Sequence, residues 1–140
     1  MNRFLFTTIF SFLFSSSLFS GVEQSYPTRE LINSGIKIID IRTESEWRQS
    51  GVLSGVYPIT FFYDDGSYNV RLFLRQLNSV VEKGEKFALI CRSGSRTKTV
   101  SRFLGQNGYN VVNLVGGMNY ATKKVGIQPV KYLPNKGYIQ

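Results

Sequence analysis

The chain has 140 residues, 42% of them hydrophobic and 14% aromatic, which fits one folded domain. It has no histidine and a single cysteine, which excludes an internal disulfide, a Cys-His or Ser-His-Asp nucleophile, and metal sites built on histidine or several cysteines. The net charge is +8, but the basic residues are dispersed, since Lys123-Lys124 is the one adjacent pair, so we expect no nucleic-acid partner. We also expect no cofactor.

The first twenty residues have the pattern of a secretory signal. Arg3 supplies a positive charge, residues 4–14 are mostly apolar, and the segment becomes small and polar before a cleavage point near Ser20-Gly21. The apolar stretch is shorter than the roughly 20 residues that span a membrane. We therefore expect residues 1–20 to be a signal peptide and residues 21–140 one exported domain, periplasmic in a bacterium with two membranes. The protein would contact a membrane if the segment stayed uncleaved.

After the signal, helical and strand patterns alternate. Residues 27–32 predict a short helix, and the apolar, β-branched run at residues 36–42 predicts a buried strand. Thr43 is a hydroxyl cap followed by acidic residues, which predicts a second short helix. Residues 56–59 predict a short strand.

The second half of the chain continues the alternation. Leucines and valines recur at close to helical spacing over residues 70–81, which predicts a helix, and residues 86–90 predict a strand. A helix over residues 97–107 should follow, then a strand within residues 109–117 that ends in paired glycines, then a helix over residues 118–124.

Most of these strands read as continuous apolar runs, which are typical of strands buried on both faces. The sequence therefore predicts an α/β fold, with a small, mainly parallel sheet and helices on both faces. Its core should cover about residues 26–125, and we expect an irregular tail from Gln128.

The single cysteine, Cys91, lies where the strand at residues 86–90 ends, and ligands of open α/β sheets bind beyond the carboxyl ends of strands. Small residues and two arginines follow it, and the next helix should start near Arg96 or Thr97. A tight curl there can turn backbone N–H groups inward, and the positive helix end would face the same point. Such surroundings stabilise a thiolate without an imidazole. The alternative is an inert core thiol.

Two stretches resemble the rhodanese (thiosulfate sulfurtransferase-like) family in its single-domain form. "IIDIRTESEWRQSGVLSGVYPI" is similar to the opening strand and the motif after it, and "FALICRSGSRTKTVSRFLGQNGYNVVNLVGGM" to the active-site strand, loop, helix and next strand. The resemblance implies that Cys91 takes a sulfane sulfur from a small anionic donor (thiosulfate, polysulfide or a persulfide). The resulting persulfide would pass its sulfur to a thiol or protein acceptor.

The resemblance also assigns roles around the cysteine. The residues expected to bind the substrate are Arg92, Ser93, Gly94, Ser95, Arg96 and Thr97. The residues expected to support the fold near the site are Asp40, Arg42 and Glu46.

Two other functions stay open. Cysteine-loop phosphatases, to which one type of arsenate reductase is related, separate cysteine from arginine by one residue more than the four found here, Arg92 to Ser95. The shorter loop makes a smaller cradle, better suited to one sulfur atom. The second alternative is a sulfur carrier that delivers its persulfide to a partner protein without turning over alone.

Overall fold

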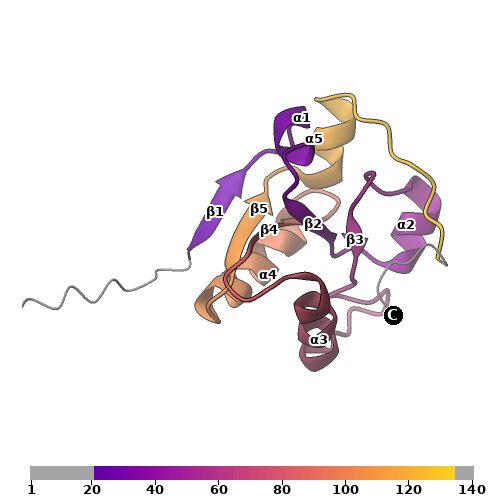
Figure 1. The fold of residues 1–140 in the computed structure, drawn as a ribbon. Helices are drawn as coiled ribbons and strands as arrows, with labels where there is room; N and C mark the ends of the chain where they lie inside the picture. Colours follow the sequence, from indigo (N-terminus) through magenta and orange to yellow (C-terminus); the bar gives the residue numbers. More distant parts are fainter. Residues whose placement is uncertain (1–20, 135–140) are drawn as a thin grey trace, which may run out of the picture.

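The computed structural model describes residues 21–134, which form one five-stranded sheet with helices on both faces (Figure 1). The strand order is β1-β5-β4-β2-β3, and every neighbouring pair is parallel. The strands are β1 (Val22–Ser25), β2 (Lys37–Asp40), β3 (Tyr57–Pro58), β4 (Lys86–Ile90) and β5 (Asn110–Leu114). The helices are α1 (Arg29–Ile32), α2 (Glu44–Ser50), α3 (Val70–Val80), α4 (Ser95–Gln106) and α5 (Gly117–Lys123). The predicted α/β fold is confirmed.

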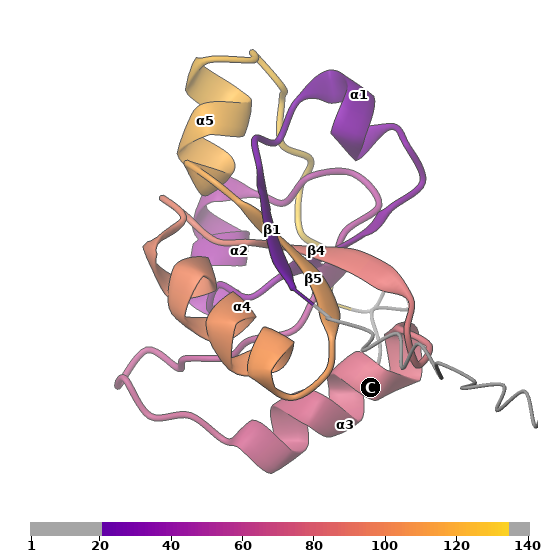
Figure 2. The ribbon, with the colours of Figure 1, turned by 90° about the vertical axis from the view of Figure 1, so that its left-hand side faces the viewer.

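The central strand β4 is buried on both faces, as its apolar run predicts. Phe87 and Leu89 belong to a core cluster under α3 and α4, whereas Ala88 and Ile90 belong to a second cluster under α1, α2 and α5. Successive side chains of a strand point to opposite faces, so both faces need an apolar cover. Figure 2 shows α3 and α4 on one side of the sheet and α1 and α5 on the other.

The buried face of α3 differs from the predicted stripe. Asn69 caps the helix, since its side chain accepts a hydrogen bond from the Leu72 amide at 3.0 Å. The residues of this helix that the structure buries are Phe73, Leu77 and Val80, whereas Leu72 and Leu74 are half-buried. Phe73 packs edge-to-face against Phe61, with ring centroids 4.8 Å apart, so the aromatic side chain is the part of the buried face that the spacing of leucines and valines does not indicate.

Strand β1 is an element that the sequence pattern does not predict. It pairs with β5 at the edge of the sheet, and its four residues are half-buried or exposed, so no apolar run marks it. The expected signal peptide, residues 1–20, lies outside the described residues. Within the part that is described, no helix has the length and apolar character needed to cross a membrane.

The irregular tail after α5 is held to the domain by contacts that the sequence pattern does not predict. Val130 forms an antiparallel bridge with Val52, with N–H···O distances of 2.9 and 2.8 Å. Tyr132 lies against Trp47 of α2, with ring centroids 5.3 Å apart. Residues 128–134 form no helix or strand, as predicted, and two contacts distant in sequence fix the course of this irregular tail.

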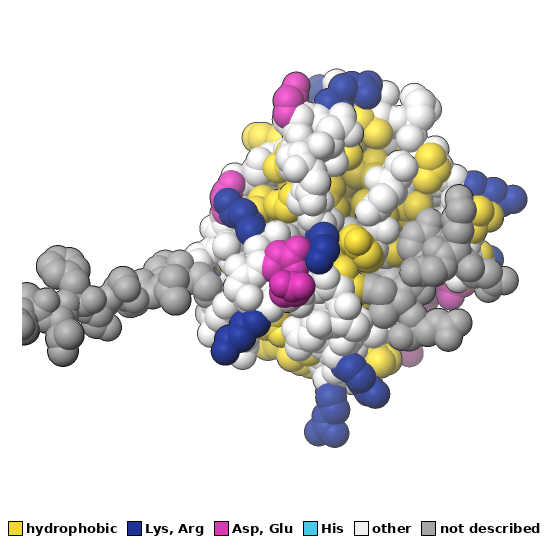
Figure 3. Space-filling view, in the orientation of Figure 1, with side chains coloured by type: hydrophobic (Ala, Val, Ile, Leu, Met, Phe, Trp, Pro, Cys, Tyr) yellow, Lys and Arg dark blue, Asp and Glu magenta, His cyan; other side chains and the backbone are white. Residues whose placement is uncertain are grey.

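The cationic side chains do not form one patch on the face shown in Figure 3, where Lys and Arg stand at separate places. The expectation that nucleic acid is not a partner stays a prediction.

Candidate active site

Cys91 directly follows β4, the strand between β5 and β2. Its side chain is fully buried, at 0% exposed, and forms part of the core cluster under α3 and α4. The sulfur accepts a hydrogen bond from the Gly94 N–H at 3.2 Å. Among the described residues this is the one amide that donates to the sulfur, where the sequence suggested a cradle of several.

Helix α4 begins at Ser95, earlier than the predicted start at Arg96 or Thr97. Gly94 is its N-cap, with a left-handed φ of 90° that favours glycine, and no side chain caps the helix. The first turn of α4 therefore starts beside the sulfur, and its unpaired N–H groups place partial positive charge there.

Thr97 is the second polar neighbour of the sulfur. Its side chain is fully buried, and its Oγ1 lies 3.6 Å from Cys91 Sγ. The hydroxyl also donates to the Gly94 carbonyl at 3.1 Å. One hydroxyl proton can serve one acceptor at a time, so it can turn from the carbonyl to the sulfur when Cys91 loses its proton.

The loop is fixed by the start of α5, a contact that the sequence reasoning did not predict. The Met118 and Asn119 amides donate to the carbonyls of Cys91 and Arg92 at 2.8 and 2.9 Å. Gly117 makes this approach sterically feasible, because a Cβ there would lie 2.2 Å from the Cys91 carbonyl oxygen. The paired glycines after β5 are the sequence signal, and their role is close backbone packing.

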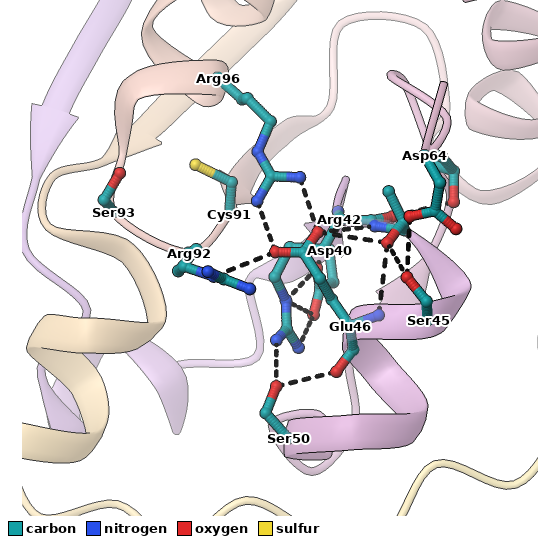
Figure 4. Close-up of polar contacts among 12 residues, drawn as sticks. Asp40, Arg42, Ser45, Glu46, Ser50, Asp64, Cys91, Arg92, Ser93 and Arg96 are labelled. Carbon is teal, nitrogen blue, oxygen red and sulfur yellow. Dashed lines mark hydrogen bonds and ion pairs between the residues drawn. The ribbon is translucent and has the colours of Figure 1, made fainter. Parts of the chain in front are cut away.

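Both arginines of the loop turn to Glu46 of α2 (Figure 4). The Arg96 guanidinium donates to both carboxylate oxygens at 2.7 and 2.8 Å, and Arg92 Nε lies 3.2 Å from Oε1. That these arginines bind the substrate stays a prediction, and their charges already have a partner within the protein.

Glu46 is strongly held in its ionised form. Burial raises the pKa of this carboxyl, but hydrogen bonds from Arg96 and the Thr43 amide, with the charges of Arg96 and Arg92, outweigh burial and lower the pKa to about 2. The same hydrogen bond raises the pKa of Arg96. Thr43 and Glu46 form a capping box at the start of α2, so this residue also fixes its own helix.

Asp40 and Arg42 form a buried ion pair beside this network. Their side chains are 0% and 2% exposed, and Arg42 Nη2 lies 2.7 Å from Asp40 Oδ2. Arg42 also donates to Ser50 Oγ at 2.9 Å and to the Gly51 carbonyl at 2.7 Å. These contacts connect the end of β2 to the end of α2, as a supporting role requires, and none of them reaches Cys91.

Ser93 and Ser95 complete the loop. Their hydroxyl oxygens lie 3.3 Å apart, and the Ser93 side chain is exposed. Of the residues predicted to bind the substrate, Gly94 and Thr97 therefore contact the sulfur, while Arg92 and Arg96 contact Glu46.

The chain matches the family model described as the rhodanese-like domain over residues 27–124. It is 30% identical over 93 residues to Protein HIGH ARSENIC CONTENT 1, mitochondrial, from Arabidopsis thaliana, covering 66% of this chain and 55% of that protein. It is 28% identical over 81 residues to Putative sulfurtransferase YtwF from Bacillus subtilis, covering 58% of this chain and 68% of that protein. The chain thus spans little more than half the length of the Arabidopsis relative.

The fold is also that of a solved protein structure. The crystal structure of Rv0390 from M. tuberculosis superposes with a TM-score of 0.51 at 22% identity, covering 74% of each chain. This likeness concerns the architecture of the sheet and its helices.

Proposed function

The chain belongs to the rhodanese-like domain family, and from that membership we propose that it is a sulfurtransferase that carries sulfur as a persulfide on Cys91. The position of Cys91 supports this most strongly. Its sulfur lies at the carboxyl end of the central strand, beside the first turn of α4, and accepts a hydrogen bond from the Gly94 amide at 3.2 Å. These donors would stabilise the thiolate before transfer and the persulfide anion after it.

The proposed transfer needs no cofactor. The Cys91 thiolate attacks the outer sulfur of thiosulfate, a new S–S bond forms, the donor S–S bond breaks, and sulfite leaves with the electron pair. A thiolate or cyanide then attacks the outer sulfur of the persulfide, and Cys91 leaves as a thiolate. Both steps exchange one sulfur–sulfur or sulfur–carbon bond for another, so no external oxidant or reductant is consumed.

Burial of the sulfur sets a condition on this chemistry. Because Cys91 is 0% exposed, a donor reaches it when residues 92–95 move away from the sulfur. The carbonyls of Cys91 and Arg92 are held by α5, and the Gly94 carbonyl accepts the Lys98 amide of α4, so the movement should be centred on Ser93.

Steady-state release of thiocyanate from thiosulfate and cyanide tests the proposal. We expect turnover for the wild type and none for Cys91→Ser, with Ser79→Ala on the exposed side of α3 as a matched serine control that keeps full activity. A carrier would take up one sulfur and hold it, with little release of thiocyanate in the absence of its partner protein. Equal rates for wild type and Cys91→Ser would exclude a persulfide on this residue.

A second candidate reaction follows from the name of the Arabidopsis relative, which refers to arsenic. The wild type should therefore also be assayed for reduction of arsenate to arsenite by a thiol reductant. We expect sulfur transfer to be the faster reaction, because four residues separate Cys91 from Arg96 and both loop arginines are paired with Glu46. A faster arsenate reaction would reverse the assignment.

A further inference from the structure

The charge on the loop's own arginines is partly cancelled. One carboxylate, Glu46, contacts both Arg92 and Arg96, so the three groups together carry a single positive charge. A donor such as thiosulfate carries two negative charges. If it approached the arginines it would have to compete with a carboxylate that already accepts hydrogen bonds from Arg96 at 2.7 and 2.8 Å and lies 3.2 Å from Arg92 Nε.

Two hollows flank the tip of the loop and differ in charge. One, of about 540 Å³, includes the carboxylates of Glu46 and Asp64 in its wall. The other, of about 290 Å³, has no carboxylate in its wall. Its lining residues are Ser93, Gly116, Asn119, Tyr120, Lys123 and Lys124. The first hollow is also lined by Arg92 and Arg96, so the charges in its wall cancel, whereas Lys123 and Lys124 give the second a net positive charge. An anion is therefore attracted more strongly on the α5 side of the loop than on the α2 side.

The second hollow has a fixed floor and cationic rim. Tyr120 lies against Tyr26, with ring centroids 4.6 Å apart, and the Asn119 amide is bonded to the Arg92 carbonyl at 2.9 Å. Lys123 and Lys124 lie one helical turn beyond Asn119 and Tyr120, on the same side of α5. Both lysines are exposed, and within residues 21–134 neither forms an ion pair with a carboxylate.

We propose that Lys123 and Lys124 bind the oxyanion group of the sulfur donor in this hollow and direct its outer sulfur toward Cys91. This inference rests on the proposed sulfur transfer, and it names the donor class as a sulfane sulfur attached to a charged oxyanion. The lysines act before the chemical step. Glu46 partly cancels the charges of Arg92 and Arg96, whereas it does not contact the two lysines, whose charges act on the donor.

The test compares Lys123→Gln/Lys124→Gln with Arg71→Gln/Arg75→Gln, which removes two exposed charges from α3 on the opposite face of the sheet. We expect the lysine variant to raise the KM for thiosulfate about tenfold with little change in kcat, as two solvent-exposed charge contacts would. For a donor without an oxyanion group, such as the hydropersulfide of 2-mercaptoethanol, which gives up its terminal sulfur and leaves as a thiolate, its KM should stay at the wild-type value. The arginine variant should match the wild type with both donors.

A binding measurement separates this proposal from the sulfur-transfer proposal. In Cys91→Ser protein, which cannot form a persulfide, thiosulfate affinity is measured by calorimetry with and without the two lysine changes. Tighter binding with the lysines present supports the subsite even if no turnover is found. Equal affinity in the lysine and arginine variants, or a KM that rises equally for donors with and without an oxyanion group, would overturn it.

Discussion

Glu46 joins the two arginines of the loop to helix α2 through one carboxylate. We expect Glu46→Gln to lower the free energy of unfolding by about 1–2 kcal/mol at pH 7, because it leaves two guanidinium groups without their counter-charge. The folded-state pKa of about 2 lies below the ordinary value of 4.5. The stabilisation is therefore complete above pH about 4.5 and is lost as the pH falls toward 2.

Urea unfolding of the wild type and Glu46→Gln from pH 7 to pH 2.5 measures this difference. It should shrink as the pH falls below about 4.5. The control is Glu44→Gln on the same helix, whose carboxylate pairs with Arg48 at an exposed position and should contribute less than about 0.5 kcal/mol. This account of the network would be contradicted if Glu44→Gln lowered the free energy of unfolding as much as Glu46→Gln does, or if the effect of Glu46→Gln did not depend on pH.

Thr97 tests the hydroxyl beside the sulfur. Thr97→Val keeps the shape of the side chain but removes the group that lies 3.6 Å from Sγ and bonds the Gly94 carbonyl at 3.1 Å. We expect sulfur uptake to slow about tenfold, the worth of one hydrogen bond to an anionic sulfur, whereas Thr97→Ser retains the wild-type rate. Rapid-quench mass measurement of the persulfide gives the rates. If valine and serine behaved alike, the hydroxyl would have no role in transfer.

At this scale, the sequence predicts the local part of the site and misses the part set by tertiary contacts. Cys91, Gly94 and Thr97 lie within one loop and its helix, so their closeness follows from chain position. The pairing of Arg96 with Glu46 joins residues 50 positions apart. That contact depends on the adjacency of β2 and β4, which no local pattern contains.

Among the elements, the packing of the loop against α5 determines where the sulfur lies. Gly117→Ala would place a methyl group 2.2 Å from the Cys91 carbonyl oxygen, at a φ of 54°. We expect Gly117→Ala to lower the free energy of unfolding by about 3 kcal/mol or more, because the steric clash adds to the cost of a left-handed backbone at alanine. Sulfur uptake should also be slower. Gly108→Ala, at a φ of 86° with nothing within 4 Å, should cost about 1 kcal/mol and leave uptake unchanged.

Chemical denaturation and persulfide mass measured on both glycine variants check this prediction. Equal losses of stability would mean that backbone strain alone, and not contact with the loop, makes the paired glycines necessary.

The sequence predicts every element of the described chain except β1, and its strongest signals are the apolar runs. Strands β2, β4 and β5 and helix α3 carry such runs, and the structure contains all of them. Strand β1 cannot be predicted from its own sequence, because it is held by pairing with β5 at the sheet edge and by the ion pair between Glu23 and Lys86. The Val52–Val130 bridge cannot be predicted for the same reason, because the residues around each partner carry no strand pattern.

At the scale of the molecule, we propose that the chain is exported and that its signal is removed near Ser20-Gly21. Strand β1 starts at Val22, so cleavage there leaves the edge strand whole. Intact mass of protein recovered from the periplasm of a two-membrane bacterium should correspond to a chain that begins near residue 21. Recovery of the full-length chain from the membrane fraction would instead favour an uncleaved anchor.

The whole account depends on a persulfide at Cys91, which intact-mass spectrometry of the folded protein after incubation with thiosulfate or polysulfide tests most directly. We predict a gain of one sulfur that cyanide removes and that Cys91→Ser never acquires. Alkylation of the native protein would show in the same experiment whether the buried thiol becomes accessible. An unchanged mass with every donor, together with a thiol that stays unreactive until the protein unfolds, would contradict the account and leave Cys91 as part of the core.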